Sequence, residues 1–155
     1  MYLSRLIYAS RGTDALTAAE FEKILEVSKR NNAKVGVTGV LLFSAREFLQ
    51  CLEGSREGIN QTYARIVRDP RHSDVQILDY REVDRRMFGE WGMHGLSPNT
   101  LTRQRLLRFG VREMFSPLRM SAASGLALLQ ELAEETPVNA RMDPSPLPAR
   151  ALASR

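Results

Sequence analysis

Two neighbouring apolar segments constrain this chain more than any other feature of its sequence. Residues 35–43 (VGVTGVLLF) are rich in β-branched and apolar side chains, and residues 48–52 (FLQCL) follow them after a four-residue loop. Short apolar runs separated by so short a loop favour two antiparallel strands joined as a hairpin. We therefore expect a sheet built around a buried β-hairpin.

A strand and a helix are predicted ahead of the hairpin. Residues 3–10 alternate and are mostly apolar, which is typical of a strand. Thr17-Ala-Ala-Glu20 has the pattern of a capping box, which begins a helix. We expect this helix to end near residue 30, because Asn31-Asn32 tolerates the left-handed conformation at a helix end.

A second helix and two more strands are predicted after the hairpin. Glu53-Gly54-Ser55 breaks the strand pattern, and Ser55 can cap a helix that ends at Asp69-Pro70. Ile59, Tyr63, Ile66 and Val67 share one face of that helix. Residues 75–80 and 91–96 complete a β-α-β-β-α-β-β order. This order predicts an α+β, ferredoxin-like five-stranded sheet with both helices on one face.

The pattern of apolar and polar residues changes after Pro98. Residues 101–109 and 121–134 look like two amphipathic helices, whereas residues 136–155 hold four of the seven prolines. We expect one main domain at 1–97, a helical extension at 98–135 and a disordered tail at 136–155. The apolar residues of the extension suit either of two roles, covering the far side of the sheet or offering a surface for association.

The composition is that of an ordinary soluble protein. The net charge of +4 is divided as +1 over residues 1–100 and +3 over residues 101–155, so no strongly basic face is evident and we expect no nucleic-acid partner. The one cysteine, Cys51, excludes an internal disulfide and a cysteine-based metal cluster. With no membrane-spanning run and no signal-peptide pattern, we expect a cytoplasmic location and no membrane contact.

A few polar side chains sit on apolar strand faces. Side chains alternate along a strand, so Gln50 shares a face with Phe48 and Leu52, and Tyr8 shares one with Leu6 and Ser10. A buried amide without a partner costs about 1–3 kcal/mol. If these faces turn toward the helices, they form an apolar slot with a few polar groups, which suits a flat aromatic cofactor. Taken alone, each residue also fits an ordinary strand or cap.

Five segments, in order, resemble the BLUF domain, the blue-light sensor that binds FAD, in its short single-domain form. They are RLIYAS at 5–10, KRNNAKVGVTGVLLFS at 29–44, FLQCLEG at 48–54, RIVRDPRH at 65–72 and FGEWGM at 88–93. The resemblance covers about the first 100 residues and implies a flavin-binding photoreceptor that is not an enzyme.

The resemblance also implies roles for individual residues. Tyr8 matches the photoactive tyrosine, and Gln50 the glutamine that bridges it to the flavin. Asn32 matches an asparagine that hydrogen-bonds the ring, and Ile24 and Ile66 match the apolar walls on either side of it. The full expected flavin-binding set is Tyr8, Ile24, Ser28, Asn31, Asn32, Phe48, Gln50, Arg65, Ile66, Asp69, Arg71 and His72, with an ordinary surface position left open for His72.

The implied mechanism is a photochemical relay. Blue light excites the flavin, Tyr8 donates an electron and a proton, and Gln50 ends rotated or tautomerised, which shifts the absorption to the red. Trp91 or Met93 is expected beside Gln50, with the choice left open. The signal would then run through the fifth strand and the C-terminal helices to a partner protein or to self-association as a homo-oligomer. FMN or riboflavin would also suit the site, because the pocket mainly recognises the flavin ring, which all three molecules share.

Two other classes share this order of elements. An RNA-binding module needs aromatic residues in an RNP1 pattern on its third strand, and residues 48–53 (FLQCLE) do not provide them. A small acylphosphatase-like hydrolase needs a phosphate-binding loop, and the first turn has no Gly-rich loop beyond Gly12.

Overall fold

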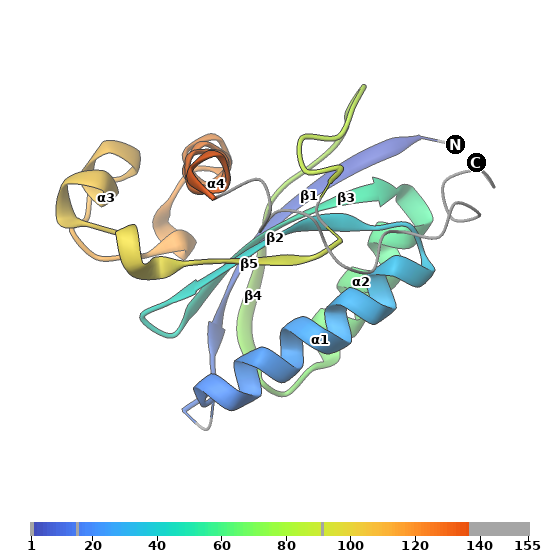
Figure 1. The fold of residues 1–155 in the computed structure, drawn as a ribbon, viewed down its shortest axis with the longest axis horizontal. Coiled ribbons are helices and arrows are strands. Elements are labelled where there is room, and N and C mark those ends of the chain that lie inside the picture. The colour runs from blue at the N-terminus through green and yellow to red at the C-terminus, as the bar shows by residue number, and fades with distance from the viewer. Residues whose placement is uncertain (1, 15, 91, 137–155) are drawn as a thin grey trace.

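The computed structural model describes residues 2–14, 16–90 and 92–136, and its elements follow the expected order (Figure 1). Of the tail predicted at 136–155, residues 137–155 lie outside the described residues, and so does Trp91. The elements are β1 (Leu3–Gly12), α1 (Ala18–Lys34), β2 (Thr38–Ser44), β3 (Glu47–Ser55), α2 (Arg56–Arg68), β4 (His72–Glu82), β5 (His94–Leu96), η1 (Pro98–Thr100), α3 (Arg103–Phe109), η2 (Pro117–Arg119) and α4 (Ala122–Glu135).

The strands form one mixed five-stranded sheet in the order β4-β1-β3-β2-β5, which confirms the predicted fold class. Neighbouring strands are antiparallel except β5, which pairs with β2 in parallel. The predicted hairpin is present. Ala45 and Arg46 form its turn and adopt positive φ values of 51° and 65°. The hairpin strands β2 and β3 therefore lie inside the sheet, where both of their faces are covered.

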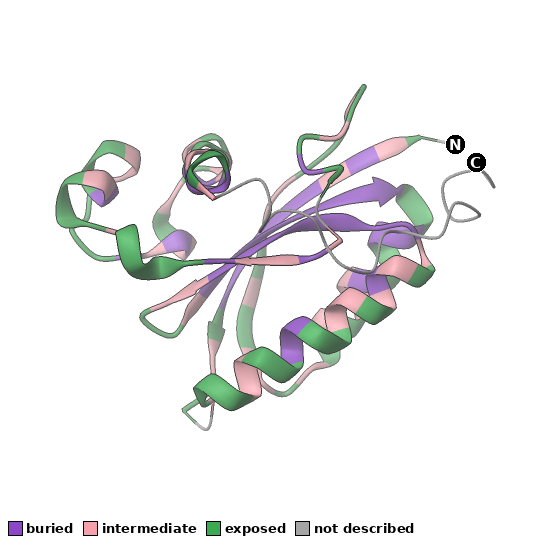
Figure 2. Ribbon diagram, in the orientation of Figure 1, coloured by how far each residue is buried: buried purple, intermediate pink, exposed green. Residues whose placement is uncertain are grey.

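Each face of the sheet has its own layer of helices. Helices α1 and α2 lie on one side, and α3 and α4 lie on the other (Figure 1). Between the layers the central strands are mostly buried (Figure 2). One apolar cluster joins Leu42, Leu49 and Cys51 to Leu128 and Leu129 of α4. The C-terminal extension thus covers the far face of the sheet, as one of its two expected roles required.

The predicted end of the first helix is wrong. Thr17 caps α1 as expected, since its side chain accepts a hydrogen bond from the Glu20 backbone N–H at 3.1 Å. The helix then continues through Asn31 and Asn32 to Lys34. The sharp turn is made instead by Gly36, whose φ of 67° favours glycine. Asparagine inside a helix has only a modest energetic cost. Burial of the Asn32 side chain outweighs this cost and keeps the residue in the helix.

The predicted strand break at Glu53-Gly54-Ser55 is also wrong, because β3 continues to Ser55. Gly54 makes this continuation possible: a Cβ there would meet the Val37 Cγ2 at 3.1 Å and the Gly36 carbonyl oxygen at 3.2 Å. Ser55 then caps α2 as predicted, accepting from the Gly58 backbone N–H at 3.0 Å.

Three further expectations need correction. Strand β2 starts at Thr38, three residues later than predicted, and β5 spans only His94–Leu96. Val67, expected to share one face of α2 with Ile59, is 52 % exposed, whereas Ile59 is 1 % exposed. Among residues 2–14, 16–90 and 92–136, no helix combines the length and apolarity that crossing a membrane requires.

Candidate functional site

A cavity lies between the sheet and the helices α1 and α2. It holds about 560 Å³ of non-atom space, a volume that includes open solvent at its mouth. Its lining brings together all but one of the expected flavin-binding residues. The lining residues are Tyr8, Ile24, Val27, Ser28, Asn31, Asn32, Leu41, Gln50, Thr62, Arg65, Ile66, Asp69, Arg71 and His72.

Tyr8 and Gln50 meet in the floor of the cavity. They are direct cross-strand partners in the β1–β3 register, and their exposed fractions are 1 % and 3 %. The Tyr8 hydroxyl donates a hydrogen bond to Gln50 Oε1. The Gln50 amide in turn donates from Nε2 to Met93 Sδ at 3.1 Å. Both ends of the Gln50 amide are therefore engaged, one by Tyr8 and the other by Met93.

The environment of Tyr8 keeps its phenol protonated. Burial raises the pKa of Tyr8 far above its ordinary value of 10.0, and the neighbouring Tyr63 and Asp69 raise it further. The Tyr63 ring stands edge-on to Tyr8, with the centroids 6.1 Å apart. A phenol that cannot ionise in the resting state remains a hydrogen-bond donor to Gln50.

Asn32 carries an unsatisfied donor in the cavity wall. The residue is 2 % exposed and lies in the third-last position of α1. Its Nδ2 has no hydrogen-bond partner among the described atoms. Burying such a donor costs about 1–3 kcal/mol unless something accepts from it. The wall therefore fits a ligand that presents a carbonyl oxygen at this point.

The mouth of the cavity is polar and carries an ion pair. Arg71 donates from Nε and Nη2 to both carboxylate oxygens of Asp69, at 2.7–3.2 Å, and its Nη1 lies 3.8 Å from Glu20. The hydrogen bonds from Arg71 lower the pKa of Asp69. Arg65 lies at the same mouth and is exposed. Guanidinium groups in this position suit the phosphate end of a ligand.

His72 belongs to the cavity wall and is only partly buried. Its Nδ1 lies 2.9 Å from the Ser10 hydroxyl, and burial lowers its pKa below 6.5. Phe48 is the expected residue that does not line the cavity. Its ring lies against His72, with centroids 4.4 Å apart, and packs in tilted arrangements against Phe21 and Phe43.

Three lining residues were missed in the sequence, although each follows from its spacing. Val27 comes one helical turn after Ile24, and Thr62 one turn before Ile66, so each shares a face with a predicted wall residue. Leu41 pairs with Gln50 across the hairpin and so points to the same face. Of the two residues expected beside Gln50, Met93 is buried and in contact, and Trp91 is outside the described residues.

Comparison with known proteins matches the first part of the chain to one family. The family model "Sensors of blue-light using FAD" (BLUF) matches residues 3–94. The blue light- and temperature-regulated antirepressor BluF of Escherichia coli is 36 % identical over 91 residues, 59 % of this chain and 23 % of that protein. The photoactivated adenylate cyclase subunit alpha of Euglena gracilis is 31 % identical over 121 residues, 75 % of this chain and 12 % of that protein.

The chain therefore spans a quarter or less of the length of these curated relatives. A solved structure, the photo-activated state of BlsA, matches over more of both molecules. Its TM-score is 0.76 at 29 % identity, and the match covers 84 % of this chain and 94 % of BlsA.

Proposed function

The chain belongs to the BLUF family of blue-light sensors that use FAD, and from this premise we propose that Tyr8 and Gln50 are the pair that detects the photon. The observation that carries the proposal is the double engagement of Gln50, which accepts from Tyr8 and donates to Met93. An amide held at both ends has two distinct arrangements, because a half turn exchanges its donor with its acceptor.

Different residues of the cavity would bind different parts of the flavin. Asn32 would offer its Nδ2 to a ring carbonyl, and Ile24 of α1 and Ile66 of α2 line the cavity and would pack against the ring. Arg65 and Arg71 at the mouth would meet the phosphates of FAD. Since most lining residues would contact the ring, FMN and riboflavin would fit the same slot.

The light reaction would use the relay in the floor of the cavity. When bound, the flavin supplies a ring that absorbs blue light and becomes a strong oxidant when excited. Tyr8, the one tyrosine among the described lining residues, would give the electron, and its proton would pass to Gln50 Oε1, with which it is already hydrogen-bonded. The electron and the proton would return to Tyr8 when the radical pair recombines. Gln50 would end rotated or tautomerised, and the bond to Met93 would break. A thioether is a weak acceptor, so this bond is the easier of the two to lose.

Met93 would pass the structural change from the cavity to the rest of the protein. This residue stands directly before β5 (His94–Leu96), which leads into the C-terminal helices. We propose that these helices pass the change to a separate effector protein or to a second copy of the chain, so that the protein is a sensor and not an enzyme. The division into a flavin part at 1–97 and a helical extension at 98–135 is part of this proposal.

The two rival functions fit the structure poorly. An RNA-binding module presents aromatic residues on an open sheet face, whereas helices cover both faces of this sheet (Figure 1). A phosphate-cleaving enzyme would need a loop of backbone N–H donors, whereas most of the residues that line the described cavity belong to strands and helices.

The deciding experiment is optical. The purified full chain should be yellow, and blue light should shift its long-wavelength band to the red, with recovery in the dark. Tyr8→Phe should keep the yellow colour and lose the shift, because a phenyl ring has no proton to give. Tyr63→Phe is the matched control, since it removes a hydroxyl from the ring beside Tyr8, and it should keep the shift. A full shift in Tyr8→Phe would show that another residue is the donor.

A further inference from the structure

The segment that joins β4 to β5 crosses one end of the whole sheet. Strands β4 and β5 are the two edges of the order β4-β1-β3-β2-β5, so the crossing spans four strand spacings, or ~19 Å at about 4.8 Å per spacing. The described residues of this crossing are 83–90 and 92–93, and near its start the Val83 backbone N–H donates to the Leu3 carbonyl at 2.9 Å. Such a long irregular segment needs support along its length.

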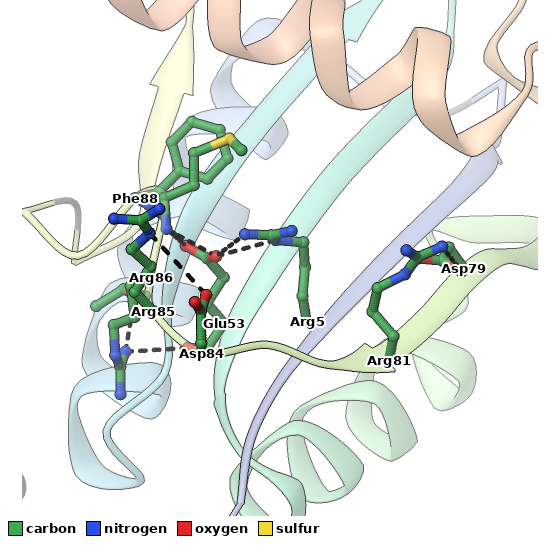
Figure 3. Close-up of polar contacts among 10 residues, drawn as sticks. Arg5, Glu53, Asp79, Arg81, Asp84, Arg85, Arg86 and Phe88 are labelled. Carbon is green, nitrogen blue, oxygen red and sulfur yellow. Dashed lines mark hydrogen bonds and ion pairs between the residues drawn. The ribbon is translucent and has the colours of Figure 1, made fainter.

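Glu53, on the central strand, holds the middle of that crossing (Figure 3). Its side chain is fully buried, and Oε1 and Oε2 both accept from the Met87 backbone N–H at 2.9 Å. Oε1 also accepts from the Phe88 backbone N–H at 2.6 Å. Hydrogen bonds to a carboxylate are stronger than those between neutral groups. Glu53 therefore holds the backbone of Met87 and Phe88 in place.

Arg5 balances the charge of this carboxylate. It is the cross-strand partner of Glu53 in the β1–β3 register. Its Nε donates to Glu53 Oε2 at 3.0 Å, and its Nη2 lies 3.0 Å from the same oxygen. The Arg5 side chain is only 12 % exposed. Glu53 is therefore tied to the sheet on one side and to the crossing segment on the other.

Arg86 ties the same segment down a second time. Its Nη1 donates to the Thr38 hydroxyl at 2.8 Å and to the backbone carbonyl of Glu53 at 3.1 Å. Its Nη2 donates to the Gly36 carbonyl at 2.9 Å. Residues 86–88 are thus fixed to β3 and to the start of β2 by both backbone and side-chain groups.

The fixed segment places one buried side chain on each side of the sheet. Phe88 is 1 % exposed and belongs to the apolar cluster under α4. Met93, five residues later and also 1 % exposed, belongs to the cluster on the cavity side. The position of Met93 against Gln50 therefore depends on where the segment is anchored at 86–88.

From this geometry we propose that Glu53 is a positioning residue for the Gln50–Met93 contact. Its carboxylate holds the crossing segment so that Met93 stays packed against the amide that must turn, and this sets the rate at which Gln50 returns to its dark arrangement. The inference rests on the proposed photochemical function, and it adds a residue that lies on the sheet face opposite the cavity.

The chemistry of the anchor requires a carboxylate. The Met87 and Phe88 N–H groups and the Arg5 guanidinium are all donors, so the side chain between them must accept on both oxygens and donate nothing. In Glu53→Gln one of those oxygens becomes an NH₂ group that faces other donors. The shape of the side chain is kept, and its hold on the Met87 and Phe88 N–H groups is lost.

The test compares dark recovery in the FAD-loaded full chain. Glu53→Gln should stay yellow and keep a red shift of the parent's size, because Tyr8 and Gln50 are unchanged. Its recovery in the dark should be at least threefold faster, since Met93 no longer presses on the turning amide. Recovery at the parent's rate or slower would overturn the proposal.

The matched control is Glu82→Gln. It makes the same chemical change at an exposed carboxylate that pairs with Arg56 at 2.5 Å, and its recovery should match the parent's. Rescue by Glu53→Asp, which keeps both oxygens, should bring recovery back toward the parent's rate. If Glu53→Gln does not fold, Arg86→Lys frees the same segment from its other anchor, and an unchanged recovery rate in that variant would equally overturn the proposal.

A second readout separates this inference from the proposed function. Hydrogen exchange of the Met87 and Phe88 amides, followed without illumination, should be at least tenfold faster in Glu53→Gln than in the parent. Unchanged protection of these two amides would refute the anchor itself. A parent chain that shows no light-driven shift would instead refute the photochemical function, and the exchange result would still stand.

Discussion

At the scale of single residues, His72 makes the stability of the protein depend on pH. Burial lowers its pKa below 6.5, while Asp69 opposes this shift and Arg71 adds to it. Between the folded pKa and 6.5 the unfolded chain binds more protons, so the free energy of unfolding falls as the pH falls through that window. The slope for one such group is at most about 1.4 kcal/mol per pH unit.

His72→Asn should flatten that slope, because its amide can still reach the Ser10 hydroxyl and does not titrate. Urea unfolding of both proteins between pH 5 and 7.5 measures the difference. The lowered pKa of Asp69 acts in a separate window, below 3.8, where stability is lost as that carboxylate protonates. Equal slopes in the two proteins would show that His72 titrates as if it were exposed.

Most of the cavity residues could be predicted from the sequence, for reasons that differ between residues. Strand alternation puts Tyr8 and Gln50 on buried faces, and only the resemblance to a flavin-binding family connects them. Their direct cross-strand pairing depends on register, which periodicity does not supply. The anchoring role of Glu53 was not predictable, since a glutamate after an apolar run favours a strand end until its buried partners are known.

At the scale of elements, helix α4 stabilises the protein by covering the sheet. Leu129 is fully buried on this helix, whereas Leu107 on α3 is 45 % exposed. Leu129→Ala should lower the free energy of unfolding by about 2–4 kcal/mol, because it leaves a cavity in the core. Leu107→Ala, the same change at an exposed site, should cost less than about 1 kcal/mol. Urea unfolding measures both, and equal costs would contradict the covering role.

Element boundaries were harder to predict than elements. Helix α1 passes its expected end because burial of Asn32 in the cavity wall outweighs the weak preference of asparagine for a helix end. Strand β3 passes Gly54 because close packing against Val37 favours a residue without a side chain. In both cases a tertiary contact overrides a local signal, and a local signal is all that one sequence supplies.

At the scale of the whole molecule, the sheet and the C-terminal helices share one core. The apolar cluster on the far face combines Ile7, Val40 and Leu49 of the sheet with Leu128 and Leu132 of α4. On the proposed division, the flavin part at 1–97 and the extension at 98–135 would be two functional parts of a single folding unit. Removing the extension would expose the whole of this sheet face to water, at a cost of ~25 cal/mol for each Å² of apolar area.

A chain ending at residue 97 should therefore associate or precipitate in the dark, whereas a chain ending at residue 136 should remain as stable as the full protein. Both apolar clusters lie within residues 6–133, so the longer chain keeps every buried contact of the described core. Light scattering after gel filtration measures association, and urea unfolding measures stability. A monodisperse residue 1–97 chain with the parent's unfolding midpoint would mean that the sheet is stable without its second layer. The C-terminal helices would then be free to leave the sheet when the signal passes, and the covering contacts would hold them only in the dark.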